Sequence, residues 1–271
     1  MKNMKIGNRI FDLNNHCYVM GILNVTPDSF SDGGKYNHLD AALHHTQEMI
    51  RDGADIIDVG GESTRPGHVV ISEEEEIARV TPVIEAIKKN FDIPVSIDTY
   101  KGSVTLAALQ AGADLVNDIW GFKHDGKVAE YTAKYEAACC LMHNRTEAVY
   151  DDFQKDFLDD LRECLAIAKR NGVADDKIML DPGVGFGKTY EMNLEIINHM
   201  DIMQVLNYPI LLGTSRKSVI GLTLDLPADE RVEGTLATTV IGVMRGASFV
   251  RVHDVKENAR IIQMTEAILA R

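Results

Sequence analysis

Three things are scarce in this 271-residue sequence: paired cysteines, basic residues and long uncharged apolar runs. Only four cysteines occur (Cys17, Cys139, Cys140 and Cys164), and none forms a C-x-x-C pair, so we expect buried, reduced thiols in the cytoplasm rather than disulfides or zinc. The 28 basic against 41 acidic residues give a net charge of −13, which argues against a nucleic-acid or membrane surface. No uncharged apolar run reaches about 18 residues, so no membrane span is expected. The N-terminus MKNMKIGNRIFDL lacks the apolar h-region of a secretory signal, so no signal peptide is expected.

What the sequence does contain is a regular alternation of short apolar runs with longer amphipathic ones. The apolar runs suit strands buried in a parallel sheet, and they lie at 17–24, 55–60, 94–98, 114–119, 137–142, 177–181, 209–214 and 248–253. The helical patterns lie at 39–52, 73–90, 101–112, 126–135, 153–171, 190–206, 229–245 and 254–270. Eight strand–helix pairs predict a single-domain (β/α)8 TIM barrel over residues 1–271. A doubly wound open sheet is the alternative, but its G-x-G-x-x-G fingerprint is absent from the first strand–helix turn.

Two local patterns add detail to this barrel. Residues 4–16 precede the first barrel strand, and their alternation with the Asn14-Asn15 turn predicts a small hairpin that caps the barrel bottom. Ser72 and Glu75 have the S-x-x-E spacing of a capping box at the start of the second helix. Apolar residues then recur at helical spacing and predict one buried stripe, formed by Ile77, Val80, Ile84 and Ile87.

Polar side chains occur where the predicted strands end, and these carboxyl ends carry the chemistry in a (β/α)8 barrel. Residues two apart in a strand share a face, so Arg251 and His253 are predicted to face the barrel mouth, while Val250 and Val252 face the helices. Taken singly, a strand-end aspartate is often only the N-cap of the next helix, and a lone histidine is often structural. The strand-end positions also include Asp58, Glu62, Asp118, Met142 and His143.

An N-cap role for each aspartate and a structural role for the histidine would not explain why so many polar residues are predicted at the same end of the barrel. Acids and an amide suit a neutral heterocycle with several N–H donors, and cations suit a phosphate or carboxylate beside it. The predicted polar site consists of Asn24, Asp98, Asn117, Asp181, Lys217, Arg251 and His253.

Loops at the same end of the barrel carry further motifs. TSRKS (214–218) leads into an apolar turn, so a helix start near Ser218 would present backbone N–H groups to an anion, with a solvated basic loop as the alternative. DPGVGFGKT (181–189) is rich in glycine but lacks the spacing of a P-loop. The loop LNVTPDSFSDGG (23–34) is predicted to be either a solvated connection or a mobile active-site loop.

Taken together, the motifs resemble those of dihydropteroate synthase. They occur in that family's order, span residues 20 to 255, and comprise MGILNVTPDSFSDGG, DIIDVGGESTRPG, SIDTYK, NDIWG, LMHNR, LDPGVGFGKT, LLGTSRKS and FVRVHDV. The resemblance implies a (β/α)8 barrel and a transferase of folate biosynthesis. This enzyme joins 6-hydroxymethyl-7,8-dihydropterin diphosphate to p-aminobenzoate, releases diphosphate, and is inhibited by sulfonamides.

The resemblance also implies roles for individual residues. The pterin would be bound by Asp98, Asn117, Met142, Asp181, Lys217 and Arg251. The diphosphate would be bound by Asn24, Arg251 and His253, with Asn24 also beside a Mg²⁺ ion. The p-aminobenzoate would contact Phe30, Thr64, Arg65, Pro66, Phe186, Lys217 and Ser218. The catalytic residues would be Asp32, Asp98, Lys217 and Arg251.

The family mechanism is an SN1-like substitution in which Asp32 approaches the pterin cation when its loop closes. Val219 and Met192 depart from common family residues, which bears on local packing only. A cytoplasmic homodimer is implied, with 190–206 and 229–245 as candidate interface helices.

Two other functions remain as alternatives. The pterin-binding module of a corrinoid-dependent methyltransferase shares the barrel but lacks the combined TPDSFSDGG and SRKS motifs. A non-catalytic barrel would not need the intact set of Asp98, Asp181, Lys217 and Arg251.

Overall fold

The eight barrel strands form one parallel sheet that closes on itself. The computed structural model describes residues 3–14, 16–25, 35–62 and 70–270. The strands are β3 (Tyr18–Asn24), β4 (Ile56–Gly60), β5 (Val95–Asp98), β6 (Leu115–Asp118), β7 (Ala138–Met142), β8 (Ile178–Asp181), β9 (Leu211–Leu212) and β10 (Phe249–Val252). Their order in the sheet is β8-β7-β6-β5-β4-β3-β10-β9. A parallel bridge between Leu180 and Ile210 joins the two ends of this order. The prediction of a (β/α)8 barrel is therefore confirmed.

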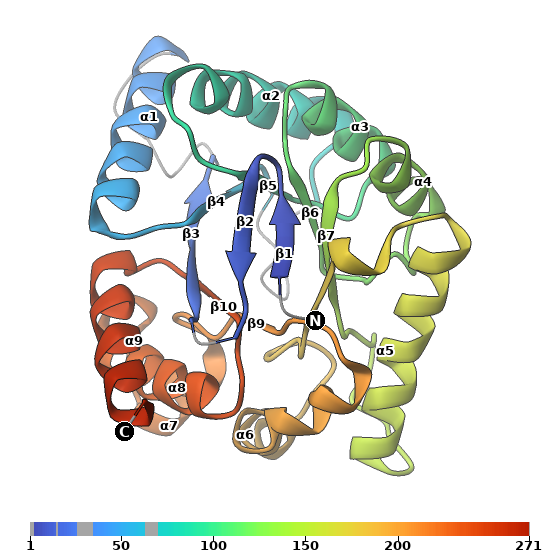
Figure 1. Ribbon diagram of the computed structural model, residues 1–271, viewed down its shortest axis with the longest axis vertical. Coiled ribbons are helices and arrows are strands. Elements are labelled where there is room, and N and C mark those ends of the chain that lie inside the picture. The colour runs from blue at the N-terminus through green and yellow to red at the C-terminus, as the bar shows by residue number, and fades with distance from the viewer. Residues whose placement is uncertain (1–2, 15, 26–34, 63–69, 271) are drawn as a thin grey trace.

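Helices surround the sheet in a ring (Figure 1). They are α1 (Lys35–Asp52), α2 (Glu73–Asn90), α3 (Gly102–Gln110), α4 (Gly126–Lys134), α5 (Phe153–Arg170), α6 (Tyr190–Asn198), α7 (Ser218–Leu224), α8 (Val232–Met244) and α9 (Val255–Leu269). Short 3₁₀ helices η2 (Asp175–Lys177), η3 (Met200–Leu206) and η4 (Ala228–Glu230) lie in the connections. No helix in the described part of the chain is long and apolar enough to span a membrane.

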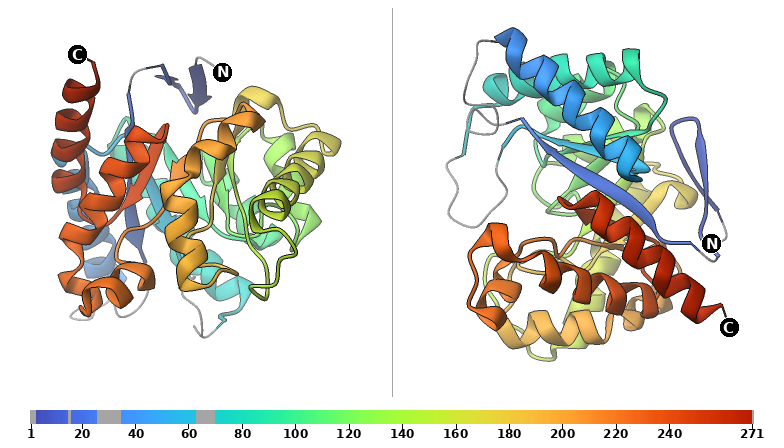
Figure 2. Two further views of the ribbon diagram at one scale, coloured as in Figure 1. Left: turned by 90° about the horizontal axis from the view of Figure 1, so that it is seen from below. Right: turned by 90° about the vertical axis from the view of Figure 1, so that its left-hand side faces the viewer.

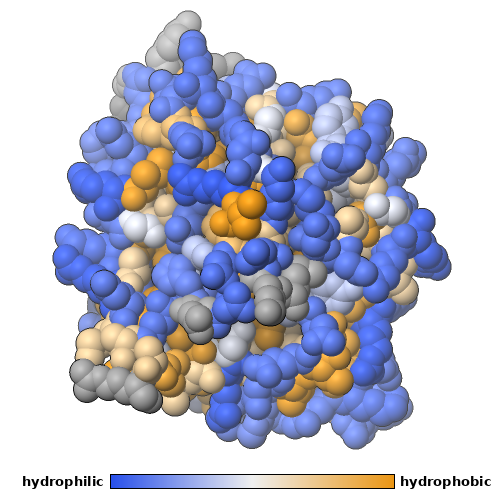
Figure 3. Space-filling view, viewed as in Figure 1, coloured by the Kyte–Doolittle hydropathy of each residue, from blue (hydrophilic) through white to orange (hydrophobic). Residues whose placement is uncertain are grey.

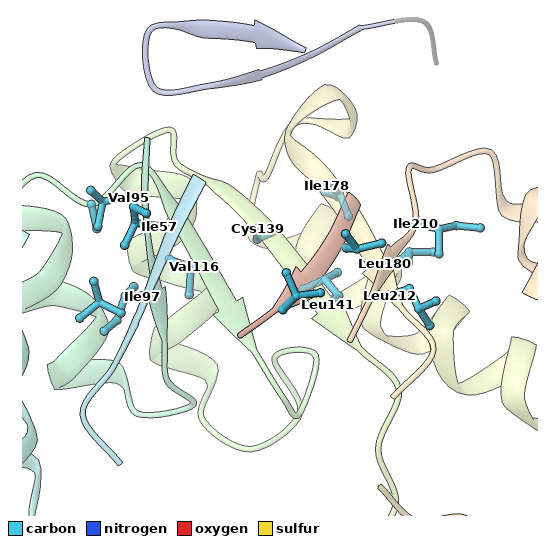
Figure 4. Close-up of a cluster of buried hydrophobic side chains, with 14 of the residues drawn as sticks. Ile57, Val95, Ile97, Val116, Cys139, Leu141, Ile178, Leu180, Ile210 and Leu212 are labelled. Atoms are coloured by element: carbon cyan, nitrogen blue, oxygen red, sulfur yellow. The ribbon is translucent and has the colours of Figure 1, made fainter. Parts of the chain in front are cut away.

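Alternation along each strand separates two apolar layers. Val95 and Ile97 of β5 belong to the large core between sheet and helices, whereas Ser96 and Asp98 occupy the alternate, inward positions. Figure 4 shows side chains of this outer core along successive strands. Val250 and Val252 join the same core, which confirms that the intervening Arg251 points into the barrel.

The barrel interior is apolar where the strands begin, and an N-terminal hairpin closes that end. Strands β1 (Asn3–Ile6) and β2 (Arg9–Asp12) pair antiparallel and lie across one end of the barrel (Figure 2). Buried side chains of the hairpin pack on residues from the strands, which confirms the predicted cap. This inner cluster consists of Met4, Ile6, Phe11, Met20, Ile56, Leu115, Ala138, Cys140, Met179, Leu211 and Phe249. Hydrophilic residues cover most of the surface at this end (Figure 3).

Two local predictions need correction. The hairpin turns at Gly7 and Asn8 rather than at Asn14-Asn15, because Gly7 adopts the positive φ of 56° that a tight turn requires. The predicted helix 190–206 is interrupted at His199, whose φ of −117° and ψ of 29° leave the helical region, and the chain continues as η3.

The predicted capping box is half correct. The Ser72 hydroxyl accepts a hydrogen bond from the Glu75 backbone N–H, as an N-cap should. The Glu75 carboxylate instead accepts a hydrogen bond from Arg79 one turn further along the helix. The predicted apolar stripe of α2 is confirmed, with Val80, Ile84 and Ile87 buried.

Candidate active site

Arg251 forms the centre of a polar cluster inside the barrel mouth. Its Nε lies 2.6 Å from Asp58 Oδ2 of β4, and its Nη2 lies 2.6 Å from Asp98 Oδ2 of β5. The Asn117 side-chain amide donates to Asp58 Oδ2 at 3.3 Å. Three strands thus hold one guanidinium, and charge-assisted bonds of this kind fix its plane.

The carboxylates of this cluster are buried and incompletely satisfied. Asp58 is fully buried and Asp98 is only 5% exposed, and Oδ1 of each has no hydrogen-bond partner among the described residues. Burial raises the pKa of Asp98 to about 7; Arg251 opposes this shift, while Asp58 and other nearby carboxylates add to it. Burial acts against the charged guanidinium, but Asp58 and Asp98 raise the pKa of Arg251 above its ordinary value. An acceptor at Asp98 Oδ1 is therefore available to a ligand N–H donor.

A second group of charges lies on the other side of the mouth. Asp181, Lys217 and Arg251 all lie near Gly213, where a β-carbon would be 3.3 Å from Asp181 Oδ2, 3.9 Å from Lys217 Nζ and 4.0 Å from Arg251 Cβ. Burial raises the pKa of the Asp181 carboxyl, and Lys217 opposes this shift. Burial also lowers the pKa of Lys217 to about 8, with Asp181 acting in the opposite direction. Met142 ends β7 beside Asp181 in the strand register and is buried.

The glycine-rich loop after β8 covers Lys217. Its Val184 carbonyl accepts a hydrogen bond from Lys217 Nζ at 2.5 Å, and Nζ lies 4.8 Å from the centroid of the Phe186 ring. The Gly183 N–H donates to Asp181 Oδ1 at 2.6 Å, which starts the loop directly from the strand end. The loop thus presents an aromatic ring and a cation side by side.

Three predicted site residues lie around this cluster. Asn24 is the last residue of β3, and its Oδ1 would lie 3.5 Å from a β-carbon at Gly60, on the side where Asp98 also approaches. His253 follows β10, and its Nδ1 lies 2.9 Å from the Ser215 hydroxyl oxygen. Ser218 is exposed and begins the seven-residue helix α7.

Five predicted residues lie outside the part of the chain that the structure describes. Two come from the first loop and three from the second: Phe30, Asp32, Thr64, Arg65 and Pro66.

Asp58 is the residue that the predicted site lacks. It was among the strand-end polar positions, and the signal for an inward position was its place between the outward Ile57 and Val59. Asp118 is neither a site residue nor an N-cap: its carboxylate accepts the backbone N–H groups of Trp120 and Phe122, both at 2.8 Å, in the loop after β6, while Asp125 is the N-cap of α4.

The chain matches one known protein family over most of its length. Residues 20–253 match the family described as pterin binding enzyme. The chain is 62% identical to a dihydropteroate synthase of Clostridium beijerinckii over 99% of its own length and all of the relative. It is 57% identical to that of Bacillus subtilis, over 93% of this chain and 88% of the relative.

Solved structures agree with these relatives. A dihydropteroate synthase from Clostridium difficile, crystallised in the presence of pteroic acid, superposes with a TM-score of 0.94 and 51% identity, covering 96% of this chain and 100% of that one. A Yersinia pestis dihydropteroate synthase in a sulfonamide complex gives a TM-score of 0.91 and 42% identity, with 99% of each chain covered.

Replacing Asp98 by asparagine should stabilise the protein at high pH. The folded pKa of about 7 exceeds the ordinary 3.8, so ionisation of Asp98 lowers the wild-type unfolding free energy progressively as the pH rises through that interval. Asparagine cannot ionise and keeps an oxygen for Arg251. Urea unfolding of both proteins should therefore show a stability gain for Asp98→Asn at about pH 8 that vanishes by about pH 4. A variant less stable than wild type at the higher pH would contradict this electrostatic assignment.

Proposed function

The chain belongs to the pterin-binding enzyme family and has the activity of its dihydropteroate synthases, and we propose that the Arg251 cluster is the pterin-binding part of that active site. The observation that carries this assignment is a guanidinium bonded by two buried carboxylates, each of which keeps an oxygen without a partner among the described residues. The reaction joins 6-hydroxymethyl-7,8-dihydropterin diphosphate to p-aminobenzoate and releases diphosphate. Sulfonamides compete with p-aminobenzoate.

The inward polar side chains suit a pterin ring. Pterin presents N–H groups along one edge, and Asp98, Asn117 and Asp181 supply oxygens from neighbouring strands to accept them. Arg251 presents its guanidinium face for stacking on the ring, and Met142 packs beside it. Because all five residues belong to strands, the pocket exists before substrate arrives.

The diphosphate lies nearer the mouth, with Asn24, Arg251 and His253 as its ligands. No cluster of three or more His, Cys, Asp or Glu side chains among the described residues could hold a metal ion by itself. Mg²⁺ needs no such cluster, because it usually keeps several waters and binds through one or two protein oxygens together with substrate phosphates. Asn24 would supply one such oxygen, and the ion would neutralise charge that develops on the departing diphosphate.

The p-aminobenzoate side is built from loops. Phe186 and Lys217 form one wall, and Ser218 with the start of α7 would receive the carboxylate. Phe30, Thr64, Arg65 and Pro66 would complete the pocket from loops outside the described residues.

The proposed reaction depends on stabilising the charge that develops when diphosphate leaves the pterin. The bond between the pterin methylene carbon and the diphosphate oxygen breaks, and its electron pair leaves with diphosphate. The cation left on the methylene is delocalised into the reduced ring and is favoured by the carboxylates of Asp98 and Asp181, with Asp32 approaching from the first loop. The arylamine nitrogen then attacks and loses its proton, so no strong general base is required.

One assay tests the activity. Wild-type protein with Mg²⁺, the pterin diphosphate and labelled p-aminobenzoate should form labelled dihydropteroate and an equal amount of diphosphate. Binding of the pterin without either product would favour the methyltransferase-type binding module, an alternative that the close synthase relatives do not support.

Arg251→Ala tests the pterin pocket. Calorimetry should show the affinity for pterin diphosphate falling by about 2–5 kcal/mol. Because the change leaves Asp58 and Asp98 without their shared partner, the unfolding free energy should also fall, by about 3–5 kcal/mol, so binding is measured where circular dichroism shows a folded protein. Arg162→Ala, which removes an exposed arginine of α5, is the control. Wild-type affinity in Arg251→Ala would refute the placement.

We also propose a cytoplasmic homodimer. The four cysteines are buried and free, as expected in a reducing compartment. Helices α8 and α9 pack together (Figure 2) and expose Ile241, Met244, Met264 and Ile268, whereas large apolar patches are uncommon on monomers. Of the two candidate segments, 229–245 includes all of α8; in the other, Leu194 and Val205 are exposed.

Light scattering tests the dimer. The wild-type particle should have twice the 30.0 kDa mass of one chain, and the double variant Met244→Glu/Met264→Glu should have the mass of one chain. Val149→Glu, which alters an exposed apolar residue elsewhere, should remain dimeric. A single-chain mass for wild type at micromolar concentration would refute the proposal.

A further inference from the structure

Lys188, at the end of the glycine-rich loop, has three hydrogen-bond partners. Its Nζ lies 2.8 Å from His143 Nδ1 and donates to the carbonyls of Gly183 at 2.9 Å and Phe186 at 3.0 Å. Burial lowers the pKa of Lys188 to about 7; in its ammonium form the group has three protons and no acceptor, so these three partners use all of them. Two of the three partners are backbone atoms of the loop that lies against Lys217.

The His143 imidazole is also held by a second hydrogen-bond partner on its other nitrogen. His143 is fully buried, and its Nε2 lies 2.9 Å from Asp160 Oδ2. If Lys188 donates to Nδ1, the imidazole proton must be on Nε2, where it is donated to Asp160. Burial lowers the pKa of His143 to about 4, which agrees with a neutral ring. Arg145 Nε, 2.6 Å from the same Asp160 oxygen, anchors the carboxylate in turn.

The loop also fits closely against the strand-end backbone that carries His143. A β-carbon at Gly183 would lie 1.9 Å from the His143 carbonyl oxygen, and one at Gly187 would lie 2.5 Å from that of Arg145. Both glycines have positive φ, 66° and 53°. A side chain at either glycine would therefore disturb the packing of the loop on this backbone. Lys188 links both halves of the loop to the buried imidazole through its hydrogen bonds.

We propose that Lys188 is a positioning residue for the arylamine half of the reaction. Lys188 acts through its loop, because it bonds to the carbonyls of Gly183 and Phe186. Between these two residues lies Val184, whose carbonyl accepts a hydrogen bond from Lys217. The Phe186 ring also lies beside Lys217. Among the described residues Lys188 has no hydrogen bond to Asp58, Asp98 or Arg251, and it acts on Asp181 only through its charge, so its main effect should fall on p-aminobenzoate rather than on the pterin. This inference rests on the proposed placement of p-aminobenzoate against Phe186 and Lys217.

The test is the steady-state kinetics of Lys188→Met, which keeps the length of the side chain and removes all three donors. KM for p-aminobenzoate should rise by at least about tenfold, while the Kd for pterin diphosphate stays within about threefold of wild type. A loop tie with a purely structural role would lower only the active fraction and leave both constants unchanged. Lys177→Met, which removes a lysine bond to the Lys5 carbonyl at 3.3 Å, is the matched control and should behave as wild type.

Lys188→Gln is the second variant, to be used if Lys188→Met does not fold, because its side-chain amide can still donate to a loop carbonyl. Its KM for p-aminobenzoate should lie between those of wild type and Lys188→Met. An unchanged KM for p-aminobenzoate in either folded variant overturns the proposal, and so does an equal loss of pterin affinity. Failure of the proposed function is recognised separately, because wild type would then form no dihydropteroate.

Discussion

The bond of Arg251 to two carboxylates is the constraint on which the site depends. A guanidinium in the barrel interior is costly unless opposite charge surrounds it, and Asp58 and Asp98 supply that charge from adjacent strands. Asp58, Asp98 and Asp181 together carry one more charge than Arg251 and Lys217. Burial raises the pKa of Asp98 to about 7, and the neighbouring Asp58 carboxylate adds to this shift. An excess of negative charge destabilises the free protein but suits a cation that forms on the substrate.

The barrel divides support and chemistry along its axis. The lower interior is filled by apolar side chains and closed by the hairpin, which gives the strands a fixed base. At their carboxyl ends the same strands carry polar residues, so the proposed pterin pocket would have the rigidity of the sheet. The proposed arylamine side comes from loops and needs its own support, which we assign to the hydrogen-bonded chain from Asp160 through His143 to Lys188.

Strand periodicity predicted much of the fold and site, because inward and outward positions alternate in every parallel strand. It placed Asp98, Asn117, Asp181 and Arg251 correctly around the mouth. It did not identify Asp58 as the partner of Arg251, since the two are 193 residues apart in the sequence and pairing at that distance depends on barrel closure. The role proposed for Lys188 is equally invisible in DPGVGFGKT, because it depends on His143, which follows β7.

The geometry of Arg251 also limits what that residue contributes to binding. A guanidinium whose edges are bonded to Asp58 and Asp98 has most of its charge balanced by those two carboxylates, and hydrogen bonds to its edges do not use its faces. It is therefore better suited to stacking on a flat ring than to attracting a diphosphate. In a protein of net charge −13, attraction for the diphosphate must arise within about 8 Å, the range of screened charges at physiological salt. In the proposed site, that requirement would give a metal ion and the groups at the mouth, Asn24 and His253, the larger share of diphosphate binding.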